Sequence, residues 1–253
     1  MKHSLHVLGS SILPVMVSLG ILSLASSFIV FLLFSFYYSV FYSLMVIFFV
    51  LIFWGKDVGM ESLSGCHNIR ISEGFRYGMY LFVFSEVMFF FSIFWFFFDC
   101  AVSSDEGAWP PSGVEMMDPM GVPFLNTMIL LTSSLTVTWA HHCLLVNKDS
   151  VMPLFVTCFL GLFFIKMQVD EYSMASFSIS DCSYGSIFYL STGFHGAHVT
   201  GGTLFLLFNL FRLFFNHFNS LNNLGLEFGI VYWHFVDVVW LFLFVFVYCW
   251  NCC

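Results

Sequence analysis

The chain alternates long apolar runs with short polar segments, and this pattern dominates its sequence. Residues 7–55 contain no Asp, Glu, Lys, Arg or His. A membrane-spanning helix needs about 20 mostly apolar residues, so this stretch is long enough for two spans and a tight turn. Ser35, Tyr37, Tyr38 and Ser39 favour a turn between residues 35 and 39. The pattern therefore predicts spans over residues 11–34 and 39–54.

Five further apolar runs follow, each bounded by polar or Pro-containing segments. They predict spans over residues 74–98, 122–146, 151–169, 184–211 and 228–250. The predicted fold class is therefore all-α, a polytopic membrane protein with seven transmembrane helices and no soluble domain.

Polar residues divide the predicted spans into two groups. The first two spans carry no charge, whereas the last five hold every charged or imidazole side chain within an apolar run. This difference predicts an N-terminal two-helix hairpin in residues 1–55 and a five-helix bundle in residues 74–253. The polar loop that joins them covers residues 56–73.

Composition and charge agree with this reading. The chain is 60% hydrophobic and 9% charged, whereas soluble domains contain about 25% charged residues. With seven spans, most basic residues fall on the side of the N-terminus, and only Lys166 leans the other way. By the positive-inside rule, the N-terminus should face the cytoplasm or the mitochondrial matrix. The basic residues on this side are Lys2, Lys56, Arg70, Arg76, Lys148 and Arg212.

Glu86 lies about 12 residues into the third predicted span, which places it near the middle of the membrane. On insertion scales, a charged Asp at that depth costs about 2.5–3.5 kcal/mol. Ionisation of Glu86 is therefore disfavoured unless a cation or a polar pocket lies nearby. We consider two roles, proton handling and a hydrogen-bonding strut between helices.

Two pairs of polar residues in the last two spans each share a helical face. His195 and His198 are three residues apart, and so are His234 and Asp237. If the two helices pack in register, these four residues form a buried polar network. The HxxH spacing also suggests a metal site, but no further ligand is evident, so we expect no metal here.

Aromatic and basic residues gather at the predicted ends of the spans. Trp54, Trp109, Trp139 and Trp233 fit an interfacial belt. Several basic side chains lie at the level of lipid headgroups, where they suit the phosphate oxygens of anionic lipids. These residues are His67, Arg70, Arg76, Arg212 and His217. No P-loop, GxGxxG beside a strand, HExxH or Ser-His-Asp pattern is present.

Nine short blocks, in this order and spacing, resemble cytochrome c oxidase subunit III. The resemblance covers nearly all of the chain after Trp54, whereas the first two spans match only in pattern. The blocks are Trp54–Val58, Glu73–Met79, Ser85–Val87, Trp109–Pro111, Val122–Thr127, Thr138–His142, Ile179–Asp181 with Tyr184–Ser186, Thr192–Gly196 with His198–Val199, and Tyr232–Phe242.

The resemblance implies a non-redox subunit of the respiratory terminal oxidase, in the mitochondrial inner membrane with its N-terminus on the matrix side. It implies that haem and copper belong to partner subunits, which reduce oxygen with electrons from cytochrome c and pump protons. This chain would stabilise the haem–copper catalytic subunit I, hold phospholipids and support proton uptake. It would bind no cofactor of its own and no nucleic acid.

The resemblance also assigns residues. Glu86 falls on the family's intramembrane glutamate. Residues near the family's bound lipids are matched by Trp54, His67, Arg76, Arg212 and His217. The chain departs from the family at Met60, Cys66, Asn222 and Asn223, which puts the details of headgroup binding in doubt.

Two other functions stay open at this stage. A stand-alone proton or metal transporter would use Glu86 with His195, His198, His234 and Asp237. A membrane haem protein would need histidine pairs that face one another along the spans, and the histidines here do not repeat along any helix.

Overall fold

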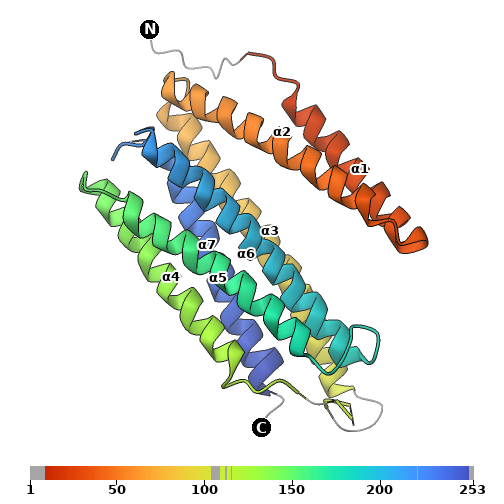
Figure 1. Cartoon of the computed structure of the whole chain (residues 1–253). Helices are drawn as coiled ribbons and strands as arrows, with labels where there is room; N and C mark the ends of the chain where they lie inside the picture. Colours follow the sequence, from red (N-terminus) through yellow and green to blue (C-terminus); the bar gives the residue numbers. More distant parts are fainter. Residues whose placement is uncertain (1–8, 104–108, 112, 115, 221, 251–253) are drawn as a thin grey trace. The chain divides into compact units, whose positions relative to one another are not determined.

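Seven long helices make up most of the computed structural model (Figure 1). The structure describes residues 9–103, 109–111, 113–114, 116–220 and 222–250. All seven helices are long and apolar enough to cross a membrane, and no strand occurs among the described residues. The predicted all-α fold with seven transmembrane helices is therefore confirmed. The helices are α1 (Leu13–Phe34), α2 (Tyr37–Leu63), α3 (Ile69–Val102), α4 (Val122–Leu145), α5 (Val151–Met174), α6 (Ser183–Phe214) and α7 (Leu224–Leu243), which continues as the π-helix η1 (Phe244–Cys249).

The helices reach further into the polar segments than the hydropathy pattern predicted. Only residues 35–36 separate α1 from α2, so the predicted turn at residues 35–39 is too long. The polar loop predicted for residues 56–73 shrinks to residues 64–68. Hydropathy marks where a helix leaves the apolar layer, whereas backbone hydrogen bonding continues through good helix formers such as Lys56 and Glu61.

The chain divides into two compact units, Met1–Phe75 and Arg76–Cys253, with the division inside α3. In the first unit, α1 and α2 run antiparallel and in contact. Ser27 and Ser43 share a hydrogen bond of 3.0 Å between their hydroxyl oxygens. A Cβ added to Gly20 would lie 2.8 Å from Ile47 Cγ1, so this glycine permits the close approach. Few residues of either helix are buried, as suits an apolar surface that lies against lipid.

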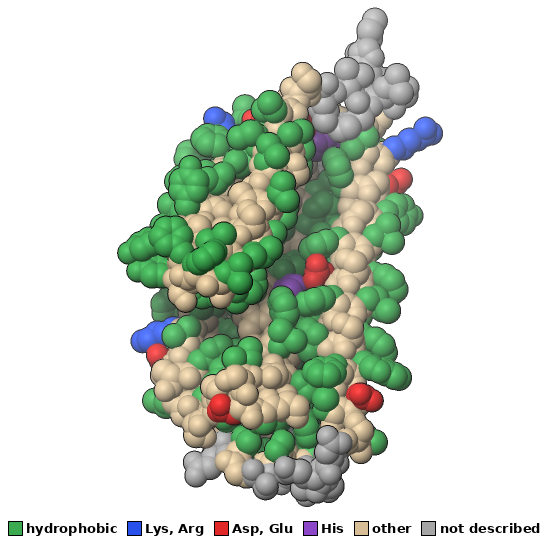
Figure 2. Space-filling model, turned by 90° about the vertical axis from the view of Figure 1, so that its right-hand side faces the viewer, with side chains coloured by type: hydrophobic (Ala, Val, Ile, Leu, Met, Phe, Trp, Pro, Cys, Tyr) green, Lys and Arg blue, Asp and Glu red, His purple; other side chains and the backbone are tan. Residues whose placement is uncertain are grey.

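In the second unit, α4, α5, α6 and α7 pack around a shared core. Contacts join α4 to α5, α5 to α6, α6 to α7 and α4 to α7. Rings of α3 meet those of the last helix, as when Phe90 approaches Phe235 and Phe94 approaches Phe246. Figure 2 shows one face of the molecule, on which hydrophobic side chains predominate and charged ones are few.

Trp233 is the centre of this core rather than part of an interfacial belt, so the sequence-based placement was wrong. Its side chain is 1% exposed, and its indole N–H donates to Ser133 Oγ at 2.9 Å. Gly161 of α5 and Gly202 of α6 leave the room that the ring fills. The pattern at the end of a span cannot reveal this, because the two glycines lie on other helices.

Candidate functional site

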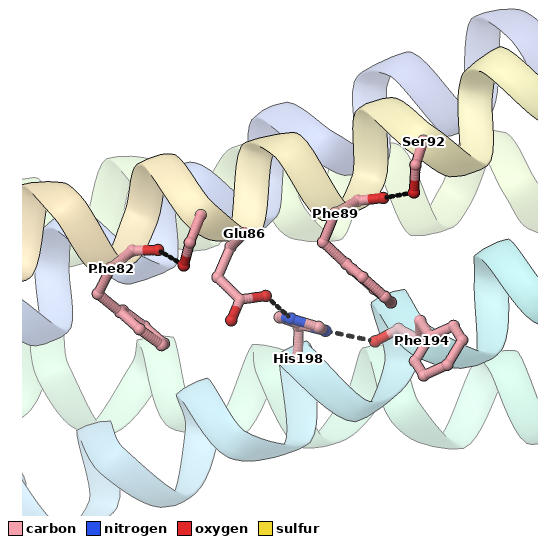
Figure 3. Close-up of polar contacts among 7 residues, drawn as sticks. Phe82, Glu86, Phe89, Ser92, Phe194 and His198 are labelled. Carbon is pink, nitrogen blue, oxygen red and sulfur yellow. Dashed lines mark hydrogen bonds and ion pairs between the residues drawn. The ribbon is translucent and has the colours of Figure 1, made fainter.

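Glu86 of α3 and His198 of α6 point toward one another across the second unit (Figure 3). His198 Nε2 lies 2.8 Å from Glu86 Oε2, and His198 Nδ1 lies 2.7 Å from the Phe194 carbonyl oxygen. A carbonyl oxygen can only accept, so Nδ1 carries a proton. Consequently the Nε2–Oε2 contact holds a single further proton, which belongs either to the imidazole or to the carboxyl group.

The pair has no net charge in either arrangement. With the proton on Nε2 it is an imidazolium and a carboxylate, and with the proton on Oε2 it is two neutral groups. A compensated pair is far less costly at membrane depth than a lone carboxylate. A partner 112 residues away therefore reduces the cost that the sequence predicted for Glu86, and no local pattern could identify this partner.

Aromatic rings surround the pair. The ring centroids of Phe90, Phe89 and Tyr232 lie 5.0, 6.3 and 6.4 Å from that of His198. The side chains of His198 and Glu86 are 15% and 23% exposed, so the pair is open to its surroundings on one side. It can therefore exchange a proton or accept a polar neighbour without opening the core.

His195, one turn from His198, makes a separate contact. Its side chain is fully buried, and Nε2 lies 3.1 Å from the Val236 carbonyl oxygen of α7. The rings of Trp240 and Phe164 lie 5.0 and 5.5 Å away between centroids. Because the carbonyl can only accept, Nε2 donates, and this histidine joins α6 to the backbone of α7.

Asp237 makes a third contact, to α4. Ser134 Oγ donates to Asp237 Oδ2 at 2.8 Å. His234 lies close enough to interact electrostatically with Asp237. Ser134 was not singled out from the sequence, although a run of Ser and Thr within an apolar span is a signal for such bonds between helices.

The structure does not bring the four residues of the predicted polar network into one hydrogen-bonded group. His198 pairs with Glu86, while His195 and Asp237 each bridge a different pair of helices. Within the described residues, no three His, Cys, Asp or Glu side chains lie where they could hold a metal ion together.

The basic residues proposed to face lipid headgroups lie in both units. In the first unit Trp54 and His67 are half-buried, and the His67 ring lies 5.1 Å from that of Phe75. In the second unit Arg76 Nη2 lies 3.2 Å from Glu227 Oε2, a partner missed from the sequence. Both side chains are partly exposed, so this ion pair contributes about 0–1 kcal/mol.

Arg212 lies in the last turn of α6, and His217 lies just after the helix ends at Phe214. The Arg212 guanidinium lies 4.3 Å from the Phe218 ring centroid, and Phe215 lies 5.9 Å from the His217 ring. Among the described residues, Arg212 forms no ion pair with an acid. Among the described residues, the contact that faces its charge is this cation–π contact with Phe218.

Comparison with known proteins gives one consistent result. The family model described as cytochrome c oxidase subunit III matches residues 3–252. Proteins named cytochrome c oxidase subunit 3 from Arabidopsis thaliana and Triticum aestivum are 44% and 43% identical, and each alignment covers 99% of this chain and 97% of the relative. The protein of that name from Dugong dugon is 45% identical over 78% of both chains.

Proposed function

The chain belongs to the cytochrome c oxidase subunit III family, and we propose that it serves the oxidase as an integral subunit without a redox centre. The match over nearly the whole chain carries this conclusion. It agrees with seven helices that can cross a membrane. The intramembrane histidines support the non-redox role, because His195 and His198 use ring nitrogens to bond other protein groups.

The direct test is purification of the native complex. The chain should co-purify with a haem–copper catalytic subunit I and further oxidase subunits, and the complex should oxidise cytochrome c. Prepared alone, the chain should show no haem absorbance. Vesicles containing only this chain should show no proton or metal-ion flux, and a flux there would support the stand-alone transporter instead.

We further propose that the Glu86–His198 pair supports proton uptake within the complex. Two ionisable side chains lie within hydrogen-bonding distance there, are partly exposed and come from two different helices. The same contact also joins α3 to α6, so a structural role is the competing reading.

Glu86→Gln separates the two roles. Glutamine keeps the size of the side chain and can still hydrogen-bond His198, but it cannot release the proton. We expect normal assembly and a fall in proton uptake of less than about tenfold, below the 10²–10⁴ of an essential proton-transfer group. Ser85→Ala is the control, since among the described residues this hydroxyl bonds only the Phe82 carbonyl oxygen of its own helix. Unchanged proton uptake in an assembled Glu86→Gln complex would favour the strut, because glutamine keeps the hydrogen bond between the two helices but cannot release a proton.

Phospholipids are the proposed ligands of the basic residues at the helix ends. Arg212 lacks an acidic partner among the described residues, and Arg76 is 45% exposed beside its ion pair. We expect Arg76→Ala combined with Arg212→Ala to reduce the anionic lipid retained by the purified complex, as measured by mass spectrometry. Lys148→Ala serves as a control on the same predicted side, and an unchanged lipid content in the double variant would refute the assignment.

The proposed location is the mitochondrial inner membrane, with the N-terminus on the matrix side. Of the basic residues behind this orientation, Lys2 lies outside the described residues, while Lys56, Arg70, Arg76, Lys148 and Arg212 lie at helix ends or loops of one predicted side. Two cysteines provide a test. Cys66 lies between α2 and α3, and Cys182 lies between α5 and α6. A membrane-impermeant thiol reagent added from the intermembrane side should label Cys182 and spare Cys66.

A further inference from the structure

A carboxyl group that none of these roles uses is buried near the end of α5. Glu171 is 2% exposed and Gln168, one turn earlier on the same face, is 5% exposed. Neither carboxyl oxygen of Glu171 and neither polar atom of the Gln168 amide has a partner in hydrogen-bonding geometry among the described residues. Buried polar groups are nearly always hydrogen-bonded, so four such atoms side by side require an explanation.

The surroundings of Glu171 are polar but uncharged. The Tyr248 hydroxyl interacts with both Glu171 and Gln168. Tyr172, the next residue along α5, hydrogen-bonds Thr192 of α6 at 2.6 Å. No Lys, Arg or His of the described chain forms an ion pair with Glu171, and the nearby Lys166 is exposed on the helix surface.

Tyr248 reaches this position because the last helix changes its winding. In an α-helix, residues five apart point about 140° away from each other. The π-helix η1 instead closes hydrogen bonds between residues five apart, which brings Tyr248 toward the side of Leu243. Both side chains are buried, at 2% and 0% exposed. The change from α-helix to π-helix therefore directs the Tyr248 hydroxyl toward Glu171 and Gln168. Short π-helical segments frequently occur at functional sites.

Helix α4 adds a further amide at this level. Thr136 and Thr157 lie 2.8 Å apart between hydroxyl oxygens on the antiparallel helices α4 and α5. Asn126 lies ten residues before Thr136 on α4, and Met167 lies ten residues after Thr157 on α5. Because the two helices are antiparallel, Asn126 is at the height of Met167, the residue before Gln168. Asn126 is fully buried, and neither its amide oxygen nor its amide nitrogen has a partner among the described residues. Its neighbour Thr127 accepts a hydrogen bond from Trp240, whose ring lies 5.9 Å from that of Tyr248.

We propose that Asn126, Gln168, Glu171 and Tyr248 form a hydrated pocket, in which Glu171 is a neutral carboxylic acid and at least one ordered water molecule completes the hydrogen bonds. Each unsatisfied buried polar atom costs about 1–3 kcal/mol. A buried water typically makes about three hydrogen bonds, so one or two waters can serve most of these atoms. An ionised Glu171 would add a penalty of several kcal/mol with no cation to offset it.

The chemistry of the pocket distinguishes it from the Glu86–His198 pair. Glu171 would hold its proton on oxygen, donate it in a hydrogen bond to water or Gln168, and leave the pocket without charge. Because Glu171 is almost fully buried within this chain, a partner subunit cannot supply the missing charge by direct contact.

The test is made on the intact oxidase. We expect infrared spectra to show one carbonyl stretching band of a protonated carboxylic acid that shifts in heavy water and is lost in Glu171→Gln. Asp170→Asn is the matched control, because this neighbouring carboxyl is exposed and should leave the band unchanged. The absence of any such band difference in Glu171→Gln would show that Glu171 is ionised and would overturn the proposal.

A second measurement needs no variant. A high-resolution map of the wild-type complex should show density for water within hydrogen-bonding distance of Glu171 and Gln168. Density for a cation, or direct hydrogen bonds between the side chains with no water, would overturn the hydrated pocket even if Glu171→Gln fails to assemble.

Discussion

Substitution of Gly161 by alanine tests whether the core around Trp233 is as tightly packed as the structure indicates. The added Cβ would collide with Thr203 Cγ2 and would lie 2.8 Å from Trp233 Cη2. Non-bonded carbon atoms prefer about 3.5–4.0 Å, so both contacts are too short. Thr203 and Trp233 are both 1% exposed and have no free space to move into.

Two effects oppose one another in Gly161→Ala. Alanine is favoured over glycine in a helix by about 0.5–1 kcal/mol. Overpacking a buried site typically costs about 1–3 kcal/mol and occasionally more. With two rigid neighbours the steric cost should win, leaving a net loss of about 1–2 kcal/mol. At about 2–4 °C per kcal/mol for a chain near this size, the thermal midpoint should fall by about 2–8 °C.

Thr203→Ser provides the matched rescue, because it removes only the methyl group that clashes. The serine hydroxyl can still bond the Thr200 carbonyl oxygen, as Thr203 does at 2.8 Å. Alone, it should cost about 0.8 kcal/mol for the lost methyl. Combined with Gly161→Ala, the loss should be smaller than the sum by at least about 0.5 kcal/mol.

The assay is the temperature at which the purified oxidase loses this chain. Gly201→Ala is the control, because no atom of the described residues lies within 4 Å of its added Cβ. A Gly161→Ala variant as stable as wild type would refute the packing described here. Strict additivity with Thr203→Ser would show that the clash with the threonine methyl is not the cause of the loss.

Three further predictions concern other contacts of the second unit. Hydrogen bonds from the Ser178 hydroxyl and amide lower the pKa of Asp181 below its ordinary value of 3.8. The turn they form should therefore be stable above pH 4 and loosen only at lower pH, as amide exchange of Ser178 would measure. Gly185→Ala would place a Cβ 2.5 Å from the Ser178 carbonyl oxygen, and the required backbone shift should cost about 1–3 kcal/mol in thermal unfolding. Trp240→Phe removes the indole donor to Thr127 and should lower stability by about 1–2 kcal/mol in the same assay, unless the bond contributes nothing.

The number and order of the helices follow from hydropathy because both depend on local composition. A run of about 20 apolar residues must satisfy its backbone within itself, and a helix is the only structure that does so in one segment. The ends of the helices are different. Lys56 and Glu61 are polar yet lie in α2. In water both a helix and a loop can have their backbone groups hydrogen-bonded, so a polar residue does not mark the end of a helix.

From the sequence, the individual residues of the candidate site could be predicted, but the contacts between them could not. Glu86 and His198 each stood out as a costly polar residue in an apolar run, but their pairing depends on the register of α3 against α6. The same limit explains why Trp233 was misplaced, since the glycines that admit its ring are on α5 and α6. Glu171 was missed because it lies just past the end of the fifth predicted span, residues 151–169.

The separation of the polar contacts favours a supporting role in the oxidase over independent proton conduction. A conducting chain needs donors and acceptors that follow one another across the membrane. Within the described residues, Glu86–His198, His195–Val236 and Ser134–Asp237 are three isolated contacts, each between a different pair of helices. Each stabilises one helix–helix interface. Of these three contacts, only Glu86–His198 joins two ionisable side chains, and both are partly exposed. Among the described residues, the hydrogen bond that leads on from this pair joins His198 Nδ1 to the Phe194 carbonyl oxygen, which can only accept and does not pass a proton on.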